Sequence, residues 1–361
     1  MKLYCAYFSL LLMVAAAASV PASDPIPGTA QQRPVALVGG TIYPVSGDPI
    51  PGGTLVFAGG KIVALGKQVN IPAAALHVDI RGRRVYPSFI ACDSQIGLVE
   101  IGAVRATRDG SEVGEINPNV RAEVSVNPDS EHIPVARANG VALVESMPTG
   151  GLISGSSALL RLDGWTWEDL LVEAPLGIHV HWPRMRVEVP EDDKKSTEAR
   201  KKRDQQLAAI HEAFAGARAY AKAKSARNAP RSLSVDLRYE ALLPVISRER
   251  PVFLHAGSQR QIRAAVEWAR GEKLRPVIVG GQAAPAMADY LKSNEVAVIY
   301  GPVHRLPMRR DMPYDAPFTG PARLHEAGVT FALTSFETSN VRNLPYHAAM
   351  AAAYGLAPEE A

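Results

Sequence analysis

Three histidines give the first indication of chemistry in this sequence. His179 and His181 stand in the segment GIHVHW, and His255 lies in VFLHA. Both segments predict β-strands, and alternate side chains on a strand point to the same face. Two imidazoles on one face, joined by a third from a neighbouring strand, would suit zinc or a similar divalent ion. The alternative is that these histidines pack beside Trp182 and bind no metal.

A long polar loop, residues 98–130, provides weaker candidates for substrate binding. It carries Arg105, Arg108 and Arg121. A loop of this length is either functional or disordered. Because the guanidinium group pairs well with carboxylates, a small acid or a peptide C-terminus is the predicted ligand. His304 follows another apolar segment and fits a loop position better than a site.

The elements that must position these residues begin near residue 86. Eight short apolar segments predict strands, and helical segments separate many of them: 88–93, 140–147, 157–162, 177–182, 251–256, 275–281, 296–301 and 329–336. This alternation predicts an α/β fold, a (β/α)8 TIM-type barrel with functional groups at the carboxyl ends of its strands. An open doubly wound sheet is the alternative.

The predicted domains are unequal in size. Residues 23–33 are proline-rich and predict a linker, and residues 34–85 predict the strands of a small antiparallel sheet, part of a β-sandwich. Residues 86–361 form the predicted barrel, which a charged helical insertion at 183–231 interrupts. That charge run is interpreted as a solvated face.

Residues 1–22 have the pattern of a signal peptide: Lys2, a long apolar run, and small residues before a cleavage point after Ala22. Cleavage after Ala18 is the competing choice, and a membrane anchor is the alternative interpretation. Prolines follow the run directly, which favours cleavage. The pattern therefore predicts an exported protein, periplasmic or secreted, with no membrane attachment once the signal is removed.

Composition excludes some classes of partner. The net charge is +3, with 47% apolar and 21% charged residues. This balance predicts a globular protein with a sizeable core and argues against nucleic acid or anionic membranes as partners. Of the two cysteines, Cys5 leaves with the signal peptide, so Cys92 has no partner for an internal disulfide.

Several segments, taken in order, resemble the amidohydrolase superfamily, and most closely its secreted, imidazolonepropionase-like branch. They are LVGGTIYPVSGD, GKIVALG, VYPSFIACDSQIGLVE, VFLHA and LHEAGVTFALTS, and the resemblance covers about residues 34–361. It implies a barrel with a small β-sandwich made from both chain ends. It also implies hydrolysis of C–N bonds in small molecules by water that one or two divalent metals activate. Family members continue beyond Ala361, so the resemblance implies that a C-terminal segment is missing.

The family's metal ligands are mostly substituted here. Asp93 and Gln95 occupy the two histidine positions of the first strand, and alternation predicts that they point together. Such oxygen ligands suit Mg²⁺ or Ca²⁺ better than zinc. His255 matches the fifth-strand histidine, the sixth-strand histidine is absent, and Phe336 stands near the eighth-strand aspartate. Cys92, between the altered positions, is predicted to face the layer between barrel and helices as an inert buried thiol.

Two functions remain open at this stage. The first is an amidohydrolase-like hydrolase acting on C–N bonds of a small, non-peptide or dipeptide-like molecule. The second is a non-catalytic homologue that binds a ligand or a partner. The sequence leaves open whether one divalent metal is bound or none, and it assigns no catalytic residue. A homo-oligomer, or pairing with an active homologue, is compatible with either function.

Overall fold

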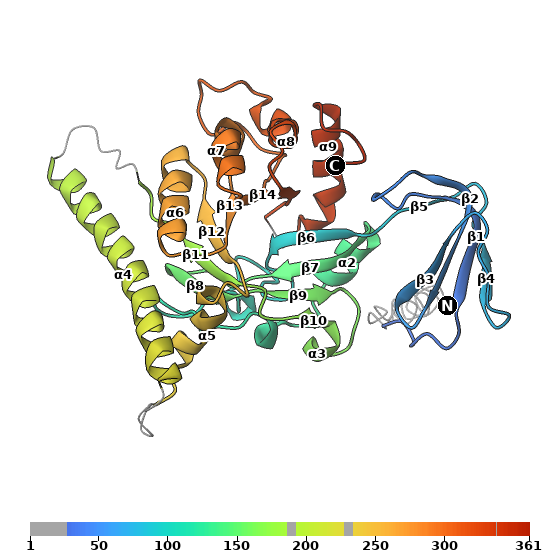
Figure 1. The fold of residues 1–361 in the computed structure, drawn as a ribbon, viewed down its shortest axis with the longest axis horizontal. Coiled ribbons are helices and arrows are strands. Elements are labelled where there is room, and N and C mark those ends of the chain that lie inside the picture. Colours follow the sequence, from blue (N-terminus) through green and yellow to red (C-terminus); the bar gives the residue numbers. More distant parts are fainter. Residues whose placement is uncertain (1–26, 186–192, 227–233, 337) are drawn as a thin grey trace, which may run out of the picture.

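The computed structural model describes residues 27–185, 193–226, 234–336 and 338–361. The predicted signal peptide, the first four residues (23–26) of the predicted linker and parts of the predicted insertion lie outside these ranges. Figure 1 shows a mixed α/β fold, with one small sheet at one end of the molecule and a long helix at the other. No helix in the described ranges is both long and apolar enough to cross a membrane.

The small sheet contains five strands: β1 (Val35–Ile42), β2 (Ile50–Ala58), β3 (Lys61–Gly66), β4 (Leu76–Asp79) and β5 (Arg84–Val85). Its order is β3-β2-β1-β4, and β5 also pairs with β1. The prediction of an antiparallel sheet was wrong for two strands, because β4 and β5 run parallel to β1. The chain after β3 returns to the start of β1 before β4 begins. Ala36, Val56 and Ala75 form a small core on this sheet.

A second sheet has the order β10-β9-β7-β6. Its strands are β6 (Phe89–Ser94), β7 (Val141–Ser146), β9 (Ala158–Arg161) and β10 (Leu171–Glu173). β6 and β7 are parallel, as an alternating β/α order requires. β9 is antiparallel to β7, so the predicted strand at 157–162 exists but does not belong to a parallel β/α repeat. No helix lies between β7 and β9, because the chain connects them through a loop and the short strand β8 (Ile153–Ser156).

The third sheet has the order β15-β14-β13-β12-β11-β8. It contains, besides β8, the strands β11 (Ile178–His181), β12 (Val252–Ala256), β13 (Pro276–Gly280), β14 (Ala297–Tyr300) and β15 (Phe331–Leu333). All neighbours from β11 to β15 are parallel, and β8 is antiparallel. At its far end, Thr334 after β15 donates a side-chain hydrogen bond to the Cys92 carbonyl of β6. The two larger sheets therefore meet at this point.

Helices cover the outer side of the third sheet: α5 (Leu237–Ile246), α6 (Gln259–Gly271), α7 (Ala288–Ser293), α8 (Ala316–Glu326) and α9 (Leu344–Ala353). The sequence of α6 explains its place. Ser258 caps its first turn in a capping box with Gln261, and Ile262, Val266 and Ala269 bury one face. The parallel strands beneath are apolar on both faces, which is why they required a helical layer.

The other helices are α2 (His132–Ala138), α3 (Trp167–Leu170) and α4 (Asp193–Ser225), with 3₁₀ turns η1 (Arg105–Thr107), η2 (Glu123–Ser125), η3 (Ala284–Met287) and η4 (Val341–Asn343). α4 is the helix predicted within the insertion. Its second half buries Ile210, Phe214 and Ala217 in the main core, while most side chains of its first half are exposed. The fully buried apolar side chains of α4 therefore come from its second half.

Candidate metal centre

Three side chains from the strands β6, β11 and β12 converge on one another. One ligand atom each of Asp93, His179 and His255 lies within 4.8 Å of the others. His179 Nδ1 is 2.9 Å from His255 Nε2, and His255 Nε2 is 3.9 Å from Asp93 Oδ1. Two ligands of a tetrahedral zinc ion are expected about 3.4 Å apart, so these separations bracket the required value.

The pairing of β11 with β12 sets the positions of the imidazoles. His181 pairs with His255, and His179 pairs with Phe253, so all four side chains lie on one face. The His179 ring stacks on Phe253 at 4.6 Å, and the His181 ring stacks on His255 at 4.2 Å between centroids. Parallel pairing thus turns two segments far apart in the sequence into one cluster of rings.

A β-bulge in β6 brings Asp93 to this cluster. The pairing of β6 with β7 shifts between Ala91 and Ser94, and Asp93 has φ +54°. An aspartate tolerates this left-handed conformation better than most residues. The bulge breaks the alternation of side chains along the strand. The predicted orientation of Cys92 was therefore wrong: it lies with Phe253 and other strand residues in an apolar cluster, not in the helix layer.

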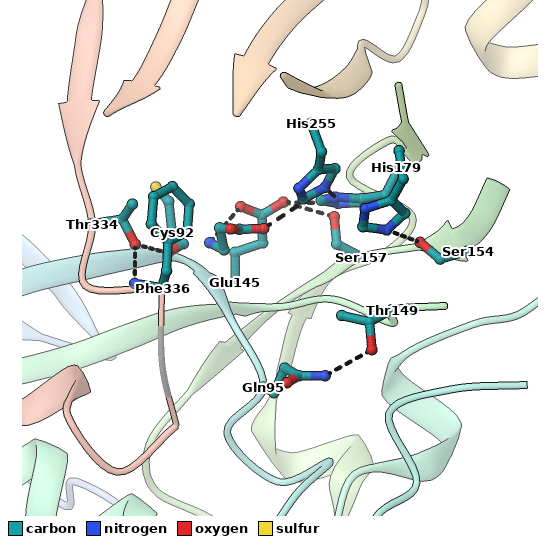
Figure 2. A network of polar contacts seen from close by, with 12 residues as sticks. Cys92, Gln95, Glu145, Thr149, Ser154, Ser157, His179, His255, Thr334 and Phe336 are labelled. Carbon is teal, nitrogen blue, oxygen red and sulfur yellow. Dashed lines mark hydrogen bonds and ion pairs between the residues drawn. The ribbon is translucent and has the colours of Figure 1, made fainter. Parts of the chain in front are cut away.

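Gln95 does not join Asp93, contrary to the prediction that the two point together. Its amide donates a hydrogen bond to Thr149 Oγ1 at 3.2 Å, and Figure 2 shows this pair apart from the histidines. His181, although stacked on His255, has Nε2 3.3 Å from Ser154 Oγ. Burial, with a smaller effect of His179, lowers the pKa of His181 to about 4. His181 is thus a neutral neighbour of the three converging groups.

Glu145 on β7 is a member of the site that sequence reasoning missed. Its carboxylate accepts hydrogen bonds from Ser157 Oγ at 2.7 Å and from the Asp93 backbone N–H at 3.2 Å. Its Oε1 also lies 3.5 Å from His179 Nε2 (Figure 2). Although burial alone raises it, the pKa of Glu145 is lowered overall by His179 and by these hydrogen bonds. A carboxylate behind a ligating imidazole fixes the orientation of the ring in metal sites.

The electrostatics of the cluster fit a cation. Burial, with the nearby Glu145 charge, raises the pKa of Asp93 well above its ordinary value, and its Oδ1 is buried without a hydrogen-bond partner. Burial also holds the pKa of His255 well below its ordinary value, so this imidazole is neutral, the form that binds metals. A divalent ion would compensate the buried carboxylates. Two imidazoles and one carboxylate are a ligand set suited to zinc.

The other predicted site residues lie apart from the cluster. Arg121 forms an ion pair with the buried Glu123 at 2.6 Å. Arg105 and Arg108 are exposed, and their guanidinium groups bond to nothing in the described ranges. Phe336 packs, as Cys92 does, against this apolar cluster and carries no ligand atom. The three arginines therefore form no carboxylate clamp in this structure.

Comparison with known proteins supports the fold. No protein-family model and no curated protein matches the sequence. Among solved structures, an amidohydrolase from Thermotoga maritima MSB8 has a TM-score of 0.79 and 24% identity, with 90% of this chain and 85% of that chain covered. An A. niger ochratoxinase is more distant, with a TM-score of 0.47, 14% identity and coverage of 91% and 81%. The predicted resemblance to the amidohydrolase superfamily is confirmed at the level of the fold.

Proposed function

We propose that this protein is a metal-dependent hydrolase of a C–N bond in a small molecule. Asp93, His179 and His255 would hold one divalent ion, zinc or similar. The observation that carries the proposal is the buried, unpartnered Asp93 Oδ1 next to two imidazole nitrogens. The fold shared with an amidohydrolase supports it, and so does the position of Asp93 and His255 near the carboxyl ends of β6 and β12, where a closed (β/α)8 barrel would carry its site.

A bound divalent ion supplies Lewis-acid chemistry: it polarises a carbonyl oxygen and makes water more acidic. The chain's own residues bind and orient. Glu145 directs His179 through the nitrogen that faces away from the cluster, and Ser157 fixes the Glu145 carboxylate. Phe253, stacked on His179, excludes water from that side of the ring. No proton donor or acceptor for catalysis is assigned.

A non-catalytic homologue is the second candidate, and one observation favours it. Phe336 stands near the position of an expected carboxylate and packs against the same apolar cluster as Cys92. A site without that carboxylate could bind a metal and a ligand but lack an acid–base group. Turnover in the experiment below separates the two functions.

The experiment measures bound metal in the purified protein by elemental mass spectrometry, together with release of ammonia or amine from cyclic amides, imides and dipeptides. We expect about one ion per chain, lost in His179→Ala and in His255→Ala. His77→Ala, on an exposed strand of the small sheet, is the matched control and should keep the ion. Folded protein without metal would refute the proposal. Bound metal without turnover on any of these substrates would favour the non-catalytic homologue.

Export and assembly extend the proposal. We propose that residues 1–22 direct export and are removed, because their pattern is that of a signal peptide. Mass spectrometry of the exported product should give an N-terminus at Ser23, or at Ser19 for the competing cleavage. The unprocessed chain in a membrane fraction would contradict it.

Self-association or pairing with an active homologue would be measured by light scattering of the purified protein.

A further inference from the structure

A cavity of about 350 Å³ opens at the carboxyl ends of β14 and β15. Polar side chains from three segments line it: His304, Ser335, Asn340, Asn343, Tyr346 and His347. None of its lining residues in the described ranges is an aspartate, glutamate, lysine or arginine. One side of it adjoins β6, since Ser335 follows Thr334, whose side chain donates a hydrogen bond to the Cys92 carbonyl.

His347 presents a fixed hydrogen-bond donor. Its Nδ1 accepts the backbone N–H groups of Val303 at 3.1 Å and His304 at 3.3 Å. The proton of the neutral ring must therefore sit on Nε2. Burial, with a smaller effect of His304, lowers the pKa of His347 to about 4, so the ring is neutral at pH 7. His347 is only 5% exposed.

Two further donors belong to the cavity. Ser335 is 3% exposed, and its Oγ has no hydrogen-bond partner. A buried hydroxyl without a partner costs about 1–3 kcal/mol, which a ligand could recover. The Asn343 amide donates one hydrogen to Asn340 Oδ1 at 3.3 Å and has a second hydrogen available. Asn343 is also the residue before α9, whose N-terminus favours negative charge.

We propose that this cavity binds the carboxylate group of a small molecule through Ser335, Asn343 and His347. A carboxylate only accepts hydrogen bonds, so it matches a set of groups that donate. An amide or an alcohol would present its own donors to these groups and pair less well. The site goes beyond the proposed hydrolysis and requires no metal.

The test compares N-acetylglycine with N-acetylglycinamide, which differ only in the carboxylate, by ligand-observed NMR titration. We expect the acid to bind, and the amide to bind at least about tenfold more weakly, as the loss of a charged hydrogen-bond partner predicts. Ser335→Ala should weaken binding of the acid by about tenfold. Asn343→Asp should abolish it by charge repulsion, and it removes no helix cap, because the Asn343 side chain makes no capping hydrogen bond to α9.

Two controls separate this site from the metal centre and from general damage. His255→Ala should leave binding of the acid unchanged, because the cavity needs no metal. Ser130→Ala, which changes a buried serine elsewhere, should also bind as the wild type does. Equal binding of acid and amide, no binding by folded protein, or binding that survives Asn343→Asp but disappears in His255→Ala would each overturn the inference.

Discussion

Replacement of Glu145 by glutamine is the sharpest test of the metal centre. Glutamine keeps the size of the side chain but removes its charge. The one side-chain oxygen of the new glutamine can still accept the Asp93 N–H, which lies 3.2 Å from the Glu145 carboxylate in the wild type. The Ser157 hydroxyl can rotate, so it allows this orientation of the amide. What is lost is the negative charge 3.5 Å from His179 Nε2. The mutation therefore acts on the orientation and basicity of one ligating ring.

The expected effect is a weaker affinity for zinc. Loss of a carboxylate that orients a ligating histidine typically costs about 10–100-fold in metal affinity. This range corresponds to about 1.4–2.7 kcal/mol. Removal of the charge also reduces the electrostatic attraction of the site for a cation, and this effect has the same sign. Competition with a chromophoric chelator at fixed pH measures the dissociation constant directly.

Glu123→Gln is the matched control. Glu123 is also a buried glutamate, but its partner is the Arg121 guanidinium, 2.7 Å away. We expect this variant to bind zinc as the wild type does. Zinc affinity within twofold of the wild type in Glu145→Gln would refute the assigned role of Glu145. Equal losses in both variants would show that zinc affinity reports general damage.

Three further predictions concern the rest of the fold. Gly155→Ala should destabilise the protein by more than about 2 kcal/mol in urea unfolding, because φ is +127° and the new Cβ would lie 2.5 Å from a backbone oxygen. Gly52→Ala is the control: Gly52 has φ +62° and open space around it, so this change should destabilise the protein less. The pKa of His347 is about 4 in the folded protein, below its ordinary value. The contribution of His347 to the free energy of unfolding should therefore be fully present above pH 6.5 and should be lost as the pH falls toward 4. In the metal-free protein, one proton changes the free energy of unfolding by about 1.4 kcal/mol per pH unit across this range. This pH dependence should be shallower in His347→Gln, and an unchanged pH dependence would contradict the prediction. Because burial raises its pKa to about 12, Cys92 in a Cys5→Ser background should react with iodoacetamide at pH 8 only after unfolding, and rapid labelling of the native protein would contradict it.

Periodicity and composition were enough to locate most elements. All eight predicted strands from residue 88 onward exist, within a few residues of their predicted ends, and the helices between them also exist. These segments are short apolar runs or amphipathic repeats, so local sequence carries the signal. Local sequence carries no such signal for the direction of a strand. β4, β5 and β9 were predicted with the wrong pairing because direction depends on which strands meet.

The site was partly predictable for the same reason. His179 could be found because alternation places it on one strand face with His181, and His255 because it matches a histidine of the family that the sequence resembles; the structure brings His179 and His255 together. Glu145 has a comparable signal, a carboxylate at the end of the apolar segment VALVES, which was available and overlooked. The polar loop gave no guide to its arginines, because their direction depends on tertiary contacts.

The sequence by itself determined the kinds of element, their order and the presence of imidazoles at strand ends. The tertiary structure alone decided which of these groups meet. A single bulge in β6 turns Cys92 and Asp93 toward the same interior and leaves Gln95 with Thr149. Side-chain alternation holds only while strand pairing stays regular, and no local pattern in a sequence records where a partner strand forces one extra residue.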